Sequence, residues 1–377
     1  MSKTLQDYAT LINDTIQSNE INHYITTDNM CQNLGGIDTF KNINIPQGKV
    51  RSFQKDDVLL SNIRLYFRKV YRAKQKGGCS SDVLVFRAKH IDSATLFAIL
   101  SSQIFTDYAC SGSQGSKMPR GNKTHMMNFK IPTINFTITK IFNSIQNKIE
   151  NNHKIKELLH KILELLYEQY FVRFDFLDEN NKPYQTSGGK MKFSKELNRL
   201  IPSGWSVRFL NHKIVSTYQP KTISKTLLND SYSYSVYGGG GIIGRFTEYN
   251  HEQSEFIISC RGQCGISYLT LPKSWITGNA MVIRPTKSYT SKTYLYHTIN
   301  KYKLTNYITG SVQPQITRQN LSTMPILIPK RKTLNKWNNI SSLLWNLIHN
   351  NMQSTQTLTA LRDFLLPLLL KQQVKPQ

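Results

Sequence analysis

Residues 133–170 read TINFTITKIFNSIQNKIENNHKIKELLHKILELLYEQY, and apolar residues recur along this stretch at alternating spacings of four and three. A seven-residue repeat of this length predicts a coiled-coil helix rather than a helix of a globular core. At about 1.5 Å per residue the helix is about 55 Å long, and its apolar stripe needs a partner. The stripe comprises Ile134, Ile138, Ile141, Ile145, Ile155, Leu159, Ile162 and Leu166, with the polar Lys148 and Asn152 between.

A second stretch near the end of the chain supplies a matching stripe. Its spacing again alternates between three and four, and subtracting 199 from its residue numbers places it on the first stripe without a break. Polar residues interrupt both stripes at the same level, where they can fix the register of a helix pair. The second stripe comprises Trp337, Ile340, Leu344, Leu347, Asn351, Ser354, Leu358, Leu361, Leu365 and Leu368.

The segments that precede the two helices also correspond. FIISC at residues 256–260 lies 198 residues after VLLSN at 58–62, and TGNAMVIRP at 277–285 lies 197 residues after SSDVLVFRA at 80–88. Each half of the chain is therefore predicted to be one mixed module followed by one long helix. Two such halves pack best with their helices antiparallel and with the modules at opposite ends, related by an approximate two-fold axis.

We predict an α+β fold with two similar modules separated by an antiparallel two-helix coiled coil, that is, a pseudo-two-fold internal repeat. Strand-like runs are expected at 57–63, 82–86 and 127–131, and shorter helices at 93–108 and 290–302. The expected boundaries are 1–132 for the first module, 133–171 for the first long helix, 172–204 for a turn-rich connector, 205–330 for the second module and 331–377 for the second long helix.

The net charge indicates a polyanionic partner. The 377 residues include 48 Lys and Arg against 23 Asp and Glu, a net charge of +25, which favours nucleic acid first and an anionic membrane second. Insertion into a membrane is not expected, because the longest apolar run is Phe364–Leu370 and a span needs about 20 residues. The first 25 residues show no signal peptide, and five scattered cysteines fit a reducing cytosol.

Motifs for catalysis are not found in the sequence. The glycine run at Tyr237–Gly244 has no following Gly-Lys-Ser/Thr, so we interpret it as a β-turn or as a loop that lets the backbone approach DNA. Cys260 and Cys264 form a single pair without further ligands at zinc spacing. Neither an amino-methyltransferase Asn/Asp-Pro-Pro-Tyr/Phe motif nor a nuclease core is visible. We therefore predict no catalytic residue and no metal site on this chain.

Basic, amide and aromatic side chains gather between the predicted strands of both modules. Arg and Lys can pair with guanine edges, Asn and Gln with adenine, and all of them can hold phosphates. The predicted DNA-binding residues are Asn62, Arg64, Tyr66, Arg68, Arg72, Gln114, Lys117, Arg120 and Lys123 in the first module, and Tyr237, Arg245, Arg261, Gln263, Gln313, Gln315 and Arg318 in the second.

Several segments resemble the specificity subunits of type I restriction–modification systems. LLYEQYFVRFDF at 165–176, NKPYQTSGGKM at 181–191 and IPSGW at 201–205 are similar to that family's central conserved region and to the start of its second target-recognition domain. Further similar segments are ITGNA at 276–280, TGSVQPQIT at 309–317 and LRDFLLPLLL at 361–370. The chain departs from the family pattern at Arg261–Gly265, which reads RGQCG, and the first module lacks an Ile-Pro-x-Gly-Trp start.

The resemblance implies a non-catalytic, cytoplasmic, prokaryotic protein that binds double-stranded DNA. Each module would be a target-recognition domain for one half of a bipartite, asymmetric sequence, and the helix pair would set the spacer. Two modification (methyltransferase) subunits and the restriction (translocase and endonuclease) subunits would dock on it. S-adenosylmethionine, ATP and Mg would then belong to those partners. Two alternatives remain: the recognition part of a fused methyltransferase–nuclease, and a coiled-coil scaffold that binds nucleic acid by charge alone.

Overall fold

The computed structural model describes residues 3–38, 43–131, 136–229, 232–262, 264–310 and 313–371. The chain divides into two compact units. Unit 1 comprises residues 1–156 and 351–377, and unit 2 comprises residues 157–350. Both long helices are divided between the units, so each unit contains one module and half of each helix. Thr133, Ile134 and Gln263 lie outside the described residues.

The module of unit 1 contains two four-stranded sheets, in the orders β1-β8-β5-β6 and β2-β4-β7-β3. The first sheet is antiparallel throughout. Its inner face packs against helix α2, which in turn contacts the first long helix through Phe97 and Phe142. The elements are α1 (Leu5–Tyr8), β1 (Ala9–Ile12), β2 (Thr15–Gln17), β3 (Tyr24–Ile25), β4 (Lys49–Phe53), β5 (Val58–Ser61), β6 (Val70–Arg72), β7 (Gly77–Cys79), β8 (Val83–Ala88), α2 (Ser93–Ser101), α3 (Gln103–Ser111) and α4 (Lys123–Met127).

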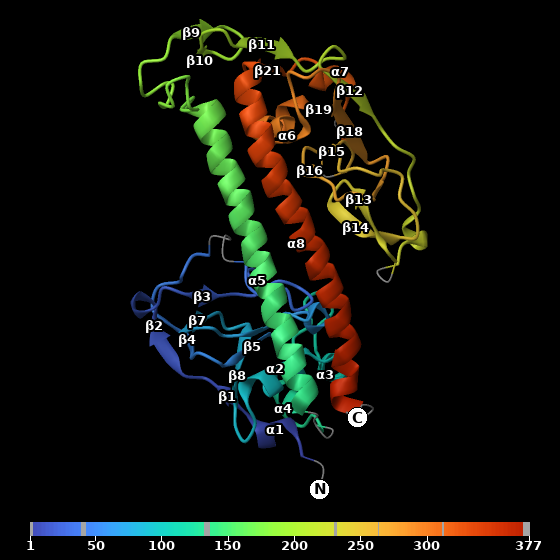
Figure 1. Cartoon of the computed structure of the whole chain (residues 1–377). Helices are drawn as coiled ribbons and strands as arrows, with labels where there is room; N and C mark the ends of the chain where they lie inside the picture. The colour runs from blue at the N-terminus through green and yellow to red at the C-terminus, as the bar shows by residue number, and fades with distance from the viewer. Residues whose placement is uncertain are drawn as a thin grey trace. The chain divides into compact units, whose positions relative to one another are not determined.

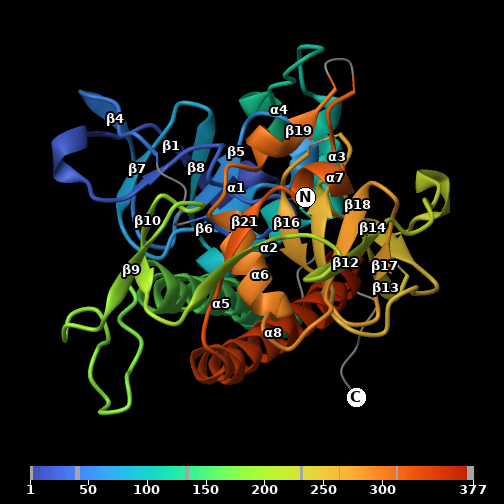
Figure 2. The same ribbon diagram turned by 90° about the horizontal axis from the view of Figure 1, so that it is seen from above.

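The module of unit 2 repeats this plan. Its main sheet has the order β12-β18-β15-β16, beside a smaller sheet β14-β13-β17. Helix α6 lies between the main sheet and the second long helix in both views of the molecule (Figures 1 and 2), and Thr293 of α6 is hydrogen-bonded to Ser341 of that helix. The elements are β11 (Ser206–Phe209), β12 (Val215–Tyr218), β13 (Tyr234–Gly238), β14 (Gly241–Phe246), β15 (Phe256–Ser259), β16 (Ser267–Leu269), β17 (Trp275–Ile276), β18 (Ala280–Pro285), α6 (Lys292–Asn300), β19 (Ile308–Thr309), β20 (Gln315–Ile316), α7 (Arg318–Leu321) and β21 (Pro325–Ile328).

The strand registers confirm the internal repeat. Val58 of β5 pairs with Phe86 of β8, and the equivalent pair in unit 2 is Phe256 of β15 with Ile283 of β18. The offsets between these residues are 198 and 197, which are the offsets that the sequence predicts. The same apolar alternation therefore builds the same sheet twice.

The two long helices are α5 (Phe136–Tyr167), which ends in a π-helical turn η3 (Glu168–Val172), and α8 (Arg331–Lys371). In unit 1, Asn152 donates from Nδ2 to Ser354 Oγ at 3.4 Å, and Arg362 donates from Nη1 to Gln146 Oε1 at 3.3 Å. In unit 2, the rings of Tyr167 and Trp337 lie 5.8 Å apart and those of His160 and Trp345 lie 5.1 Å apart. In these contacts, lower residue numbers on α5 pair with higher residue numbers on α8. The two helices are therefore antiparallel within each unit (Figure 1).

The buried face of the long helices follows the heptad prediction only in part. Ile138, Ile145 and Asn152 are buried as predicted, but Ile141, Lys148, Ile155 and Ile162 are exposed. The neighbouring residues are buried in their place, namely Phe142, Ile149 and Leu163 on α5 and Ser341, Trp345, Ile348 and Arg362 on α8. The reason is that each helix packs against a module as well as against the other helix, which requires a wider apolar face than a two-stranded seam.

Three smaller expectations need correction or refinement. Residues 127–131 form no strand, because Met127 ends α4 and Lys130 makes only an isolated bridge to Thr4. The predicted helix at 93–108 is divided at Ser102, whose side chain caps the second helix. The turn-rich connector contains a β-hairpin of β9 (Met191–Ser194) and β10 (Arg199–Pro202).

Candidate nucleic-acid interface

Two loops of the unit 1 module are held side by side. They are the loop after β5, at residues 62–68, and the loop before α4, at residues 112–122. The backbone N–H of Gly121 donates to the carbonyl of Asn62 at 3.1 Å, and that of Arg64 donates to the carbonyl of Pro119 at 2.9 Å. Ile63 and Arg120 form a bridge between the loops. We call this pair of loops the unit 1 loop pair.

Most predicted DNA-binding residues of the first module lie on this loop pair. Gln114, Lys117, Arg120 and Lys123 are exposed, and Arg120 makes an ion pair with Asp82 at 3.0 Å that leaves most of its side chain in solvent. Tyr66 is also exposed and contacts the edge of Phe67. The structure therefore brings together cations, an amide and an exposed aromatic ring from segments about 50 residues apart.

Unit 2 has an equivalent loop pair, formed by residues 260–266 after β15 and residues 309–318 before α7. The N–H of Ile316 donates to the carbonyl of Cys260 at 3.1 Å, and Arg261 and Gln315 form a bridge. These contacts correspond to the Gly121–Asn62 and Ile63–Arg120 contacts of unit 1, with offsets of 195 to 198. Arg261, Gln313, Gln315 and Arg318 are exposed on this unit 2 loop pair.

Other predicted residues are engaged within the protein. Arg68 donates from Nη2 to the carbonyl of Ser101 at 2.9 Å, and burial lowers the pKa of its guanidinium group. Arg72 lies 3.7 Å from Asp56, and Arg245 donates to the carbonyl of Ser233. These three arginines and the partly buried Arg64 have less freedom to meet DNA than the exposed set.

Tyr237 and Asn62 are buried. The Tyr237 ring belongs to an apolar cluster with Ile257 and Val282, and its hydroxyl accepts a hydrogen bond from the N–H of Leu271 at 3.0 Å. Burial raises the pKa of Tyr237 to about 12. The glycine run after Tyr237 forms the tight connection between β13 and β14, in line with the β-turn interpretation. Asn62 keeps its Oδ1 without a partner among the described residues.

Each module also has an ion pair between a buried carboxylate and a partly exposed arginine, which the sequence reading did not identify. Arg87 of β8 holds both oxygens of Asp57 at 2.8 Å, and the equivalent Arg284 of β18 holds Glu255 at 2.7 Å. Residues 205–330 contain fourteen Lys and Arg against four acidic residues. One of those four is neutralised by Arg284 and another, Glu252, lies 3.8 Å from Lys273. The surface of this module is therefore strongly basic.

The long helices expose two equivalent sets of large apolar side chains. In unit 1 the set is Ile141, Leu361 and Phe364, and in unit 2 it is Ile340, Ile162 and Leu165. Each member is related to its counterpart by the same offset of 199, and between 37 and 67% of each residue is exposed. We call them the unit 1 and unit 2 apolar triplets. Exposed apolar side chains mark protein interaction surfaces where they form contiguous patches, and the two triplets are therefore candidate surfaces of this kind.

Neither a metal site nor a membrane-spanning helix is found in the part of the chain that the structure describes. The described residues hold no group of three or more His, Cys, Asp or Glu side chains placed to bind a metal ion. None of the described helices is both long and apolar enough to cross a bilayer.

Each unit therefore has a basic module with paired loops, joined to long helices that are antiparallel within the unit. Residues 202–361 match the family model described as the type I restriction modification DNA specificity domain. This match identifies residues 202–361 as a DNA specificity domain of the type I restriction–modification kind. The resemblance seen in the sequence is thereby confirmed.

Two similar proteins illustrate the relationship. The type I restriction enzyme MjaIX specificity subunit of Methanocaldococcus jannaschii is 21% identical over 312 residues, which cover 73% of this chain and 67% of that protein. The crystal structure of the type I restriction–modification system S subunit from M. genitalium matches with a TM-score of 0.62 at 14% identity. It covers 98% of this chain and 95% of that chain, and it shows that the fold is shared.

Proposed function

We propose that this chain reads a bipartite DNA sequence, with each module recognising one part. The observation that carries the proposal is the pair of equivalent loop pairs, one on each basic module, with different side chains at equivalent positions. Ile63 in unit 1 corresponds to Arg261 in unit 2, and Arg120 corresponds to Gln315. Because arginine and glutamine favour different base edges, two scaffolds of one shape can read two different sequences.

We further propose that the chain has no catalytic role and recruits two copies of a methyltransferase subunit. The two apolar triplets support this part, because equivalent surfaces fit two copies of the same partner. Restriction subunits would join the same assembly. S-adenosylmethionine, ATP and Mg are expected on the partner subunits.

Replacing residues 205–330 with the second module of another specificity subunit tests the proposal. The chain is expressed with its methyltransferase partner, and methylated sites in the host DNA are mapped by sequencing. We expect one part of the methylated target to change and the other part to stay. A target in which both parts change, or neither does, would reject independent reading by the two modules.

A second experiment tests whether helix length sets the spacer. Seven residues are inserted after Asn151 in α5 and seven near Asn351 in α8, which preserves the heptad frame. The insertion adds about 10 Å of helix, equal to about three base pairs. We expect both parts of the target to be kept and the spacer to lengthen by about that amount. An unchanged spacer would rule out this role for the helices.

A further inference from the structure

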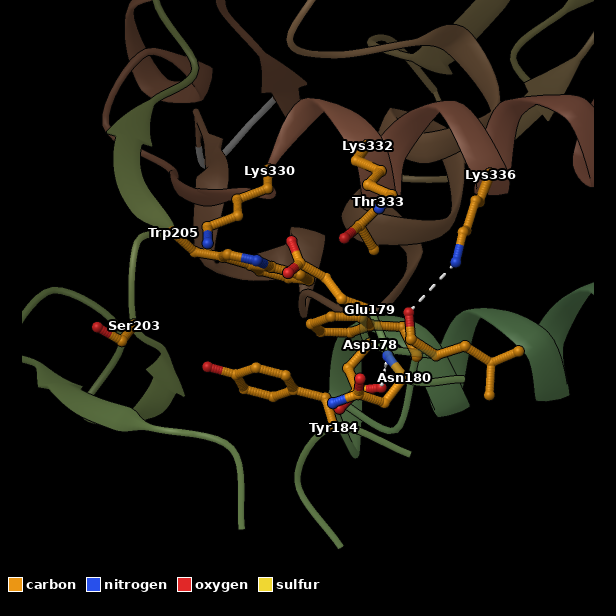
Figure 3. Close-up of a pocket in the computed structure, with 12 residues that line it drawn as sticks. Asp178, Glu179, Asn180, Tyr184, Ser203, Trp205, Lys330, Lys332, Thr333 and Lys336 are labelled. Carbon is orange, nitrogen blue, oxygen red and sulfur yellow. Dashed lines mark hydrogen bonds between the residues drawn. The ribbon is translucent and has the colours of Figure 1, made fainter. Parts of the chain in front are cut away.

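A pocket of about 350 Å³ lies in unit 2, where the connector meets the first turn of α8 (Figure 3). Its walls include Lys330, Lys332, Thr333 and Lys336 on one side, and Glu179 with the aromatic Trp205 on the other. We call it the α8 N-terminal pocket. It lies outside both loop pairs and both apolar triplets, so the proposed function leaves it unexplained.

The electrostatics of this helix start favour an anion. The first helical hydrogen bond of α8 runs from the N–H of Leu334 to the carbonyl of Lys330 at 3.0 Å. The N–H groups of residues 331–333 come before it and therefore have no acceptor within the helix. Lys330 has no acceptor with which to cap them, and the first turn contains no acidic residue. Helix N-termini stabilise negative charge, yet here Lys330, Arg331 and Lys332 add positive charge.

Thr333 provides an independent indication of a ligand. It is only 6% exposed, and its side chain points from α8 into the pocket (Figure 3). No hydrogen bond joins its hydroxyl to another described residue, and the hydroxyl oxygen is not among the fully buried polar atoms without a partner. A ligand oxygen in the pocket would accept the hydrogen bond that this hydroxyl otherwise makes with solvent.

Two of the lysines that line the pocket have a defined contact with the surrounding backbone. Gly204 has a φ of +88°, and a Cβ at that position would lie 2.7 Å from Cε of Lys330, so the glycine makes room for the lysine chain. Lys336 donates from Nζ to the carbonyl of Leu177 at 3.3 Å and thereby joins the two walls. Lys336 is therefore held in position by the opposite wall, whereas Lys330 and Lys332 are exposed lysines beside it.

Glu179 lies in the lining of the pocket and brings a negative charge toward its lysines. Its carboxylate points toward the space beside Lys330 and Thr333 in Figure 3, and it makes no ion pair within 4.0 Å among the described residues. The residue is exposed on a turn of the connector. It can therefore leave the pocket when a stronger anion enters.

We propose that the α8 N-terminal pocket binds a phosphate group, which displaces the Glu179 carboxylate. Lys330 and the N–H groups at the start of α8 hold the phosphate oxygens, and Thr333 donates one hydrogen bond. A phosphate suits the site better than a carboxylate, because three oxygens can meet donors that converge from the helix, the lysine and the hydroxyl. The phosphate comes either from a free ion or nucleotide, or from the DNA backbone.

Titration of the full chain with inorganic phosphate at constant ionic strength tests the proposal. We expect Thr333→Val, which keeps the side-chain shape, to weaken phosphate binding about tenfold. Lys330→Gln should weaken it further, and Glu179→Gln should strengthen it because the competing charge is gone. Lys303→Gln, at an exposed lysine of the same unit, serves as the matched control and should have no effect.

A binding site predicts that Glu179→Gln strengthens phosphate binding and that Thr333→Val weakens it. A cluster with only a structural role would not change phosphate affinity in opposite directions. The proposal is overturned if Glu179→Gln binds no phosphate, or if neither Thr333→Val nor Lys330→Gln weakens binding. If Lys330→Gln fails to fold, Thr333→Val still tests the proposal, because it removes only one hydroxyl group.

A second titration identifies the source of the phosphate, using the chain bound to duplex DNA. If a backbone phosphate fills the pocket, bound duplex blocks free phosphate, and Lys330→Gln lowers the slope of log affinity against log salt by about one. If free phosphate still binds and the slope is unchanged, the natural ligand is a free phosphate or a nucleotide. This titration rests on DNA binding, whereas the phosphate titration does not, so failure of the proposed function would leave the pocket intact.

Discussion

Phe364→Ala should remove one of two docking sites for the methyltransferase subunit. Phe364 belongs to the unit 1 apolar triplet and is 67% exposed. A phenylalanine presents about 200 Å² of surface, so about 130 Å² remains for a partner to cover. At about 25 cal/mol per Å², full coverage contributes about 3 kcal/mol, or about a hundredfold in affinity. Half coverage gives about tenfold, and we expect a loss between these values.

The assay is native mass spectrometry of the chain titrated with purified methyltransferase subunit. The wild-type chain should bind two copies, and Phe364→Ala should bind one copy with unchanged affinity and the second only weakly. Leu165→Ala, the counterpart in unit 2, should weaken the other site, and the double variant should weaken both. Phe193→Ala, at an exposed phenylalanine of the β9–β10 hairpin, is the control. Loss of both copies from a single folded variant, or of neither from the double variant, would refute the two-site reasoning.

Three further predictions concern stability. Arg87→Met should lower the free energy of unfolding by about 1–3 kcal/mol in chemical denaturation, because the buried Asp57 carboxylate loses two charge-assisted hydrogen bonds from a partly exposed arginine. Burial lowers the pKa of His297 to about 3 and that of His349 to about 4, so stability should be full above pH 6.5 and fall by about 1.4 kcal/mol per pH unit per histidine below it, as measured by urea unfolding between pH 7 and 5. Asn351→Leu should raise the midpoint of thermal unfolding, because it removes a polar group from the helix seam.

These stability predictions have their own controls. The Asp57→Asn/Arg87→Met double variant should recover part of the loss, because no charge is then left buried. His297→Phe should reduce the pH dependence by about one proton, and an unchanged slope would mean that this histidine is not buried in its neutral form. The reasoning for the seam would be wrong if Asn351→Leu lowered the melting midpoint.

The long helices and the repeat were predictable because heptad spacing and residue offsets are properties of the chain itself. The choice between Ile141 and Phe142 at the seam was not, because both are apolar and only the position of Phe97 in the module decides which one is buried. Sequence could place Arg261 and Gln315 in the same module, but the bridge between them depends on tertiary structure. The burial of Tyr237 has the same origin, since a tyrosine before a glycine run fits a loop as well as a strand.

The α8 N-terminal pocket shows the same limit at a binding site. Lys330, Lys332 and Lys336 are visible in the sequence as ordinary surface cations. Only the folded connector brings Glu179 opposite them and covers Thr333. Neither spacing nor composition could have shown that the side chain of this threonine would face a pocket.

The contacts between α5 and α8 differ between unit 1 and unit 2. This difference explains why α5 pairs with α8 rather than with a copy of itself. Gln146 meets Arg362 in unit 1, where Arg362 is 1% exposed and Gln146 also donates to the carbonyl of Leu34. The equivalent positions in unit 2 are Trp345 and Leu163, both buried and apolar.

Because the frames of α5 and α8 coincide, two chains could in principle pair α5 with α5. That pairing would place Gln146 against Leu163, and pairing α8 with α8 would place Arg362 against Trp345. Each mismatch buries a polar group without its partner, at a cost of about 1–3 kcal/mol for the amide and more for the guanidinium. The sheets and apolar triplets are features that the two units share. The contact between α5 and α8 is where the units differ. This difference favours pairing of α5 with α8 over pairing of either helix with a copy of itself.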